Sequence, residues 1–216
     1  MPDKQTTLAT LHDVGIVPVI RASSPEKAIK IVEAIRSGGV NVFEITMTVP
    51  GAIGVIQQLH DHYGEQALLG AGTVLDAATA RQAVQAGASF VVGPSLDLGV
   101  IEACKQLGVA VCPGALSPTE VVAAWRAGAD VVKIFPCGNV GGADYIKALK
   151  APLPQIEMMP TGGVDLSTAA DFIKAGSFCL GVGAALVDKQ AVEQGNYPAL
   201  TDLARKFVEI IRTARA

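Results

Sequence analysis

The sequence predicts an α/β protein whose strands and helices alternate and close into a single eight-stranded barrel. Three observations predict this fold. Short runs rich in Val and Ile alternate with amphipathic stretches along nearly the whole chain, a pattern typical of parallel strands covered by helices. Eight such runs can be counted, and 216 residues suit one barrel of this kind. We therefore expect a single (β/α)8 domain, a TIM barrel, over residues 1–216, with a short helical segment at its N-terminus.

Turn and capping residues delimit the predicted strands and helices. Ser24-Pro25 places proline at the first position of a helix, and Ser117 with Glu120 has the spacing of a capping box. Glycines close the helical stretches at 38–39, 87, 108, 128 and 176, where a left-handed cap is favoured. An open, doubly wound sheet is the structural alternative to the barrel. The predicted strands are 16–21, 40–46, 68–73, 90–93, 109–112, 131–135, 156–161 and 178–183.

Composition and charge narrow the class of protein. Half of the residues are hydrophobic and 17% are charged, which leaves apolar surface for subunit contacts beyond a large core. A net charge of −3 gives no broad positive field for nucleic acid or anionic membranes. The polar start of the chain and the lack of long apolar runs predict neither a secretory signal nor a membrane span. We expect a cytoplasmic, oligomeric protein whose partner is a small molecule.

A metal centre is not expected, because the sequence lacks a cluster of suitable ligands. It has three histidines, of which His60 and His62 lie two apart on a helical stretch and so point to different faces. His12 precedes the first predicted strand. The cysteines are widely spaced, without a CxxC pair, and are expected to be reduced. They are Cys104, Cys112, Cys137 and Cys179.

Polar side chains gather at the C-terminal ends of the predicted strands. In a βα barrel these ends meet around one mouth, where the chemistry of such enzymes lies. Alternation along each strand separates residues that point inward from residues that meet the helices, such as Phe43 and Ile134. The predicted inward set is Val19, Arg21, Val42, Glu44, Thr46, Ala71, Thr73, Val131, Lys133, Phe135, Met159 and Thr161.

Lys133 is the most unusual member of this set, because it lies in the apolar run 131–136. Apolar surroundings disfavour a charged ammonium group and favour the neutral, nucleophilic amine. Such an amine can condense with a ketone to an iminium, which stabilises the carbanion formed when a neighbouring carbon–carbon bond breaks. The sequence therefore predicts the Schiff-base lysine of a metal-free aldolase. The alternative is a structural lysine that reaches solvent or pairs with a carboxylate.

Glu44 is a second ionisable residue inside an apolar strand. By the same alternation it faces inward, so it shares the predicted interior with Lys133. The two residues are interpreted either as a buried salt bridge or as a nucleophile with its general acid/base, the groups that an imine mechanism needs. Alternation alone supports both interpretations.

Two glycine-containing loops are candidate anion sites. They follow the last two predicted strands, where barrels commonly bind phosphate on backbone N–H groups and at the start of the next helix. Tight turns are the alternative explanation of these glycines. Arg21 is the one inward guanidinium; it either binds a carboxylate or phosphate or lies on the surface. The loop residues are Thr161, Gly162, Gly163, Gly181, Gly183 and Ala184.

Several short motifs occur in order over about residues 8–212. They are GIVPVI (15–20), FEIT (43–46), GAGTV (70–74), GP (93–94), CPG (112–114), VKIFP (132–136) and PTGG (160–163). Together they resemble the 2-keto-3-deoxy-6-phosphogluconate (KDPG) and 4-hydroxy-2-oxoglutarate (KHG) aldolase family. The resemblance implies a class I aldolase without a cofactor that cleaves KDPG to pyruvate and glyceraldehyde 3-phosphate. It also implies that the chain, like many relatives, cleaves KHG.

The resemblance further implies an assembly and a role for each site residue. It implies a homotrimer that acts in the Entner–Doudoroff pathway. Lys133 would form the imine, and Glu44, acting through a water, would take the proton of the C4 hydroxyl. The implied substrate-binding residues are Phe135 beside the imine, Thr73 and Thr161 at the pyruvyl carboxylate, and Gly162 and Gly163 at the phosphate. Further mouth residues in the predicted site are Arg21, Thr46, Pro94, Gly183 and Ala184.

Two positions depart from the family pattern. Relatives often carry an arginine shortly after the glutamate and a serine after the eighth strand, where this chain has Thr48 and Ala184. Each lost contact to an anion would cost about one or two powers of ten in affinity, unless another group such as Arg21 replaces it. The alternatives are therefore an aldolase for the galactonate epimer or for an unphosphorylated 2-keto-3-deoxy acid, a phosphate-binding barrel of isomerase or synthase type, and a non-catalytic ligand-binding barrel.

Overall fold

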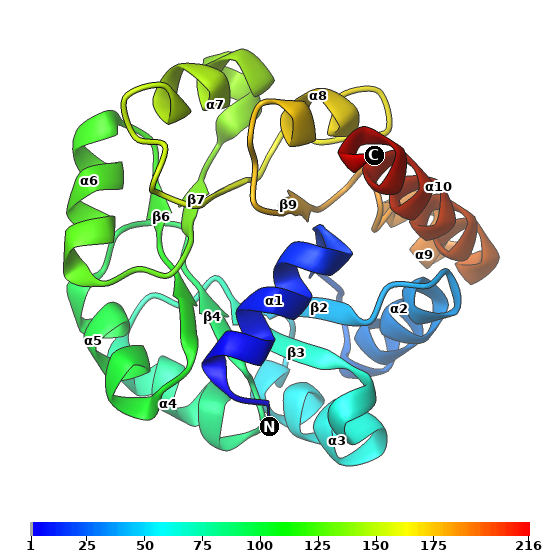
Figure 1. Ribbon diagram of the computed structural model, residues 1–216. Coiled ribbons are helices and arrows are strands. Elements are labelled where there is room, and N and C mark those ends of the chain that lie inside the picture. Colours follow the sequence, from blue (N-terminus) through cyan, green and yellow to red (C-terminus); the bar gives the residue numbers. More distant parts are fainter. Residues whose placement is uncertain (1) are drawn as a thin grey trace.

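The computed structural model describes residues 2–216 and has its strands inside a ring of helices (Figure 1). The strands are β1 (Ile16–Ile20), β2 (Val42–Thr46), β3 (Leu68–Gly72), β4 (Phe90–Val92), β5 (Ala110–Cys112), β6 (Gly114–Ala115), β7 (Val132–Ile134), β8 (Met158–Pro160) and β9 (Leu180–Val182). The helices are α1 (Lys4–Val14), α2 (Pro25–Ser37), α3 (Ala52–Tyr63), α4 (Ala77–Gln85), α5 (Leu98–Leu107), α6 (Pro118–Ala127), α7 (Ala143–Lys150), α8 (Ala169–Lys174), α9 (Lys189–Glu193) and α10 (Tyr197–Arg215).

The strands pair in parallel and form two curled sheets, in the orders β5-β4-β3-β2-β1-β9 and β6-β7-β8 (Figure 1). This confirms the predicted α/β fold with parallel strands covered by helices. Each predicted strand is present and ends within two residues of its predicted bounds. The addition is β6. Pro113, directly after the predicted fifth strand, lacks an N–H group and separates β5, which pairs with β4, from β6, which pairs with β7.

Backbone contacts connect the two sheets on both sides. On one side β5 and β6 are successive segments, and the carbonyl of Pro113 between them accepts a hydrogen bond from the N–H of Lys133 (2.9 Å). On the other side the N–H of Phe178 donates to the carbonyl of Met158 (2.9 Å), and Thr161 and Gly181 form a parallel bridge. The C-terminal ends of the strands in both sheets therefore lie on the same side of the molecule.

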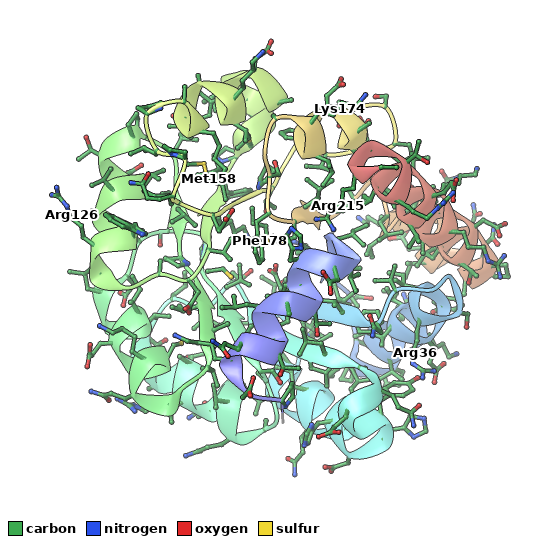
Figure 2. The ribbon with its side chains drawn as sticks, in the orientation of Figure 1. Arg36, Arg126, Met158, Lys174, Phe178 and Arg215 are labelled. Carbon is green, nitrogen blue, oxygen red and sulfur yellow. The ribbon has the colours of Figure 1, made fainter. Side chains whose placement is uncertain are left out.

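Helix α1 lies across the opposite side, at the N-terminal ends of the strands (Figure 1). Its Leu11 is buried against the early residues of several strands. Arg215, at the end of α10, donates hydrogen bonds to the carbonyl oxygens of His12, Asp13 and Phe178 (Figure 2). These bonds tie the C-terminal helix to α1 and to the segment that leads into β9.

The helix ends follow the predicted capping residues. Ser117 and Glu120 form the capping box at the start of α6, and Ser24 accepts a hydrogen bond from the N–H of Lys27 (3.3 Å) at the start of α2. Gly108 and Gly128 end α5 and α6 with φ angles of 69° and 104°, in the left-handed region. Among residues 2–216, none of the helices combines the length and the apolar character that crossing a membrane requires.

Alternation along the strands separates two apolar layers. As predicted, Phe43, Ile45, Val132 and Ile134 pack against the helices. The interior layer consists of the alternate positions, together with Leu11 of α1. Its members in or next to the strands include Val17, Val42, Leu68, Phe90, Val92, Ala110, Cys112, Val131 and Met159.

Strand β3 is oriented differently from the prediction. Ala71 packs in the layer that faces the helices, so its predicted inward orientation was wrong. Gly70 and Gly72 occupy the inward positions instead. A Cβ atom at Gly70 would lie 2.3 Å from the ring of Phe90, and one at Gly72 would lie 2.0 Å from Oε1 of Glu44. Large neighbours on the adjacent strands thus fill the space that side chains on β3 would need.

Candidate active site

Lys133 and Glu44 lie together in the interior. Lys133 extends from β7 and Glu44 from β2, and their side chains are 5% and 0% exposed. Nζ of Lys133 lies 3.9 Å from Oε1 of Glu44. Among the described residues, neither carboxylate oxygen of Glu44 has a hydrogen-bond partner. The two groups therefore face each other across the interior, and the carboxyl group keeps its hydrogen-bonding capacity for another molecule.

The surroundings of Glu44 change the pKa of its carboxyl group. Burial raises the pKa of Glu44 above the ordinary value of 4.5, and the nearby positive charges of Lys133 and then Arg21 oppose this rise. The carboxyl group therefore retains its proton to a higher pH than an exposed glutamate does. A carboxyl group with a raised pKa is a stronger base than an exposed glutamate, which suits a group that accepts and returns a proton.

Phe135 covers one side of the lysine. It follows β7 and is half-buried. Nζ of Lys133 lies 5.4 Å from the centre of its ring, within the range of a cation–π contact. The apolar ring limits the access of water to the amine, and a planar adduct of the amine could stack on it.

Two threonines that were predicted for the site differ in their hydrogen bonding. Thr46 donates from Oγ1 to the carbonyl of Ile20 (3.0 Å), and its hydroxyl also lies 2.7 Å from that of Thr48. Thr161 is buried next to Gly181, and its Oγ1 has no partner within residues 2–216. A hydroxyl that is buried without a partner costs stability, so Thr161 rather than Thr46 has an unused donor for a ligand.

The loop after β8 is a tight turn. Gly162 and Gly163 have φ angles of 85° and 77°, and a Cβ atom at Gly163 would lie 2.6 Å from Cα of Gly138. No helix begins directly after this loop, contrary to the prediction. The carboxylate of Asp165 accepts hydrogen bonds from the N–H groups of Ser167 (2.7 Å) and Thr168 (3.1 Å), and it occupies the turn that precedes α8.

The loop after β9 also differs from the prediction, because five residues separate Gly183 from the start of α9 at Lys189. The carbonyl of Gly183 accepts hydrogen bonds from the N–H groups of Leu186 (3.0 Å) and Val187 (2.8 Å), which folds the loop into a turn. Both glycine loops therefore offer backbone N–H groups at the strand ends without a helix N-terminus directly behind them.

The remaining predicted residues lie just beyond the strand ends. Arg21 is exposed after β1, and Pro94 follows β4 with its backbone against Gly114. Thr73 follows β3 and has a φ angle of 57°, in the left-handed region. This backbone conformation interrupts the strand alternation after Gly72, so the inward orientation of Thr73 stays a prediction. Within residues 2–216, no three side chains of the metal-binding types gather at a common point.

The sequence matches the model of the KDPG and KHG aldolase family over residues 8–203. The chain belongs to this family. It is therefore a class I aldolase, a lyase that acts through a Schiff base between a lysine and a keto acid.

Individual members of the aldolase family agree with this assignment. The chain is 32% identical to the 2-dehydro-3-deoxy-phosphogluconate aldolase of Treponema pallidum over 95% of this chain and 98% of that protein. It is 36% identical to the 2-dehydro-3-deoxy-6-phosphogalactonate aldolase of Escherichia coli K12 over 92% and 95%. The KDPG aldolase of Legionella pneumophila, solved with pyruvate captured as a covalent carbinolamine, superposes with a TM-score of 0.83 at 28% identity, over 92% of this chain and 96% of that one.

The aldolase has a cavity that sequence reasoning did not find. It measures about 340 Å³ and lies between the ends of β1, β2 and β9. Its lining includes Arg21, Gly183 and Ala184 from the predicted site, but also Lys27 and Lys189. The signal for Lys27 was its place in the first turn of the helix that follows Arg21. A lysine in a helix is ordinarily a solvated surface residue, so this signal is weak.

Proposed function

We propose that this aldolase cleaves KDPG to pyruvate and glyceraldehyde 3-phosphate with Lys133 as the Schiff-base lysine. The observation that carries the proposal is the buried pair of Lys133 and Glu44, 3.9 Å apart, with a carboxyl group that has no partner in the described residues. A buried amine beside a proton-transfer group is the arrangement that imine chemistry needs.

The reaction uses the two groups in sequence. The amine of Lys133 adds to the C2 carbonyl, and loss of water gives an iminium. Glu44 takes the proton of the C4 hydroxyl, directly or through a water. The C3–C4 bond then breaks, its electron pair moves toward the iminium, and the aldehyde leaves. Glu44 returns the proton to C3 of the enamine, and water hydrolyses the imine to release pyruvate and free Lys133.

The other site residues hold the substrate. We assign the pyruvyl carboxylate to Thr161, whose buried hydroxyl has no partner within the described residues, and to Thr73. Phe135 packs beside the imine. The phosphate contacts the backbone of the glycine loops. These binding positions are Gly162, Gly163, Gly183 and Ala184, with Arg21, Thr46 and Pro94 around the mouth.

A second substrate has a specific observation in its favour. The relative at 36% identity acts on the phosphogalactonate epimer, which differs from KDPG in configuration at C4. Pyruvate release from both epimers and from KHG separates these substrates. We expect the highest kcat/KM for KDPG. A kcat/KM at least tenfold higher for the galactonate epimer would replace the proposed substrate while leaving the lysine chemistry in place.

We also propose that the two curled sheets close into one (β/α)8 barrel and that the chain assembles as a homotrimer. Closure is supported by the covalent link at Pro113 and by the bridge between Thr161 and Gly181. Subunit contacts are supported by exposed apolar side chains, including Leu98 (62% exposed) and Trp125 (43%). Light scattering after size-exclusion chromatography should give about three times the chain mass. The cytoplasmic location stays a prediction.

A further inference from the structure

The cavity beside the active site carries an unusual balance of charge. Three cationic side chains line it, from Arg21, Lys27 and Lys189, against the single carboxylate of Glu193. The side chain of Lys189 lies mostly in solvent, since it is 89% exposed. Its Nζ lies 3.8 Å from Oε1 of Glu193. The remaining cations, Arg21 and Lys27, therefore make the cavity positive.

Lys27, like Arg21, has no ion-pair partner among the described residues. It lies in the first turn of α2 and is half-buried. Within residues 2–216 its ammonium group has no carboxylate at ion-pair distance. A partly desolvated cation without a counterion favours an anionic ligand.

The cavity lies next to the catalytic pair. Val19, which lines it, is opposite Glu44 in the register of β1 and β2. Arg21, also on its wall, is near enough to Glu44 for its charge to oppose the rise that burial causes in the pKa of that carboxyl. The wall residues Val19 and Arg21 therefore place the cavity beside Glu44.

Short side chains keep the cavity open. Thr48 and Ala184 are on its wall. The hydroxyl of Thr48 forms a hydrogen bond with the hydroxyl of Thr46, 2.7 Å away. Gly183 of the proposed phosphate loop lines the same space. An anion here would contact the loop and Lys27 together.

A second cavity near the site is a weaker candidate for an anion. It lies between α7 and α8, measures about 600 Å³, and is lined by Gly163, Lys147 and Lys174. Asp144 and Asp171 line it as well, so its two cations are matched by two carboxylates. The cavity near Arg21 is the one with excess positive charge.

We propose that Lys27 is a specificity residue of this aldolase, which together with Arg21 binds the distal phosphate of the aldehyde half of the substrate. The inference rests on the proposed function, since it requires a keto acid attached at Lys133. A charge-assisted hydrogen bond of this kind changes affinity by about ten- to a hundredfold. Lys27 would thus supply the cation at the anion site where Thr48 and Ala184 supply none.

The test compares Lys27→Met with Lys30→Met, one turn further along α2. Lys30 is exposed and lies over the ring of Tyr197, away from the cavity. We measure kcat and KM for KDPG and for unphosphorylated 2-keto-3-deoxygluconate. In Lys27→Met the ratio of the two kcat/KM values should fall about ten- to a hundredfold, mainly through KM for KDPG. Lys30→Met should keep the ratio of the parent protein, and Lys27→Arg should restore most of it.

Inorganic phosphate provides a second readout. It should inhibit the parent protein competitively with KDPG, and Lys27→Met should weaken that inhibition by a similar factor. Non-competitive inhibition would place the phosphate site away from the substrate and overturn the proposal. An unchanged ratio in Lys27→Met, or an equal loss for both substrates, would also overturn it. If the parent protein forms no borohydride-stable adduct with pyruvate, the proposed function itself fails, which is a different outcome.

Discussion

Nζ of Lys133 and Oε1 of Glu44 are 3.9 Å apart, on strands that are not neighbours in the sheet order. The distance is longer than a hydrogen bond, so the pair interacts through space and the carboxyl group is not fixed by the amine. The gap leaves both groups able to contact a third molecule.

The stability of the protein should depend on pH through Glu44. Burial raises its pKa in the folded state above the ordinary 4.5, so in the window above 4.5 the folded state binds a proton that the unfolded state has lost. The free energy of unfolding contributed by this group therefore falls as pH rises through that window. Glu44→Gln removes the titration. Urea unfolding at several values between about pH 5 and 8 should show a smaller pH-dependent loss in the variant. Parallel curves for the two proteins would contradict the raised pKa.

The same variant should separate the formation of the imine from turnover. Glu44→Gln keeps the shape of the side chain but cannot accept a proton, so cleavage should slow by about a hundredfold or more. Pyruvate should still form a reducible adduct with Lys133. The acidic limb of the kcat/KM profile, which lies above pH 4.5 in the parent protein, should disappear. Turnover equal to that of the parent protein would remove Glu44 from the mechanism.

Gly72 should be needed to position Glu44. A Cβ atom there would lie 2.0 Å from Oε1 and 2.5 Å from Cγ of Glu44, so Gly72→Ala must displace the carboxyl group. We expect kcat for keto-acid cleavage to fall at least about tenfold while pyruvate trapping persists.

Gly54→Ala is the matched control for that change, because Gly54 lies in α3 with nothing within 4 Å of an added Cβ atom. It should keep its activity and gain about 0.5–1 kcal/mol of stability. A fully active Gly72→Ala protein would show that Glu44 has more freedom than its packing implies.

Thr161→Val and Thr46→Val should differ in their effects on the free energy of unfolding. The hydroxyl of Thr161 is buried without a partner in the described residues, so its removal should leave the free energy of unfolding unchanged or raise it by up to about 1 kcal/mol. The hydroxyl of Thr46 bonds the carbonyl of Ile20, so Thr46→Val should cost about 1–2 kcal/mol.

Thr161→Val should also raise KM for the keto acid about tenfold, because it removes a donor to the carboxylate. Denaturant unfolding and pyruvate-release kinetics measure the two effects. A Thr161→Val protein that is less stable than the parent and binds substrate equally well would assign the hydroxyl to the fold rather than to the ligand.

The central features of the fold and of the site could be predicted from the sequence because they depend on short-range patterns. Apolar runs and capping residues predicted the strand positions, and alternation placed Glu44 and Lys133 on the same face of their strands. The rule that parallel strand ends meet at one mouth then brought them together. These inferences need no knowledge of which side chains touch.

The features that were missed depend on contacts between distant segments. Gly70 and Gly72 have no side chain to reveal a period, so the inward face of β3 is decided by the bulk of Phe90 and Glu44 on neighbouring strands. The cavity near Lys27 exists because short side chains from three separate loops leave space there. Nor does the glycine pattern alone reveal that Asp165 occupies the turn before α8.

The most direct test of the account is borohydride reduction in the presence of pyruvate, followed by peptide mapping. We expect one reduced pyruvyl adduct, located on Lys133, in the parent protein and in Glu44→Gln. Lys133→Met should give no adduct and should lose at least about a thousandfold in turnover. The absence of an adduct, or an adduct that maps to another lysine and forms equally in Lys133→Met, would contradict a Schiff base at Lys133.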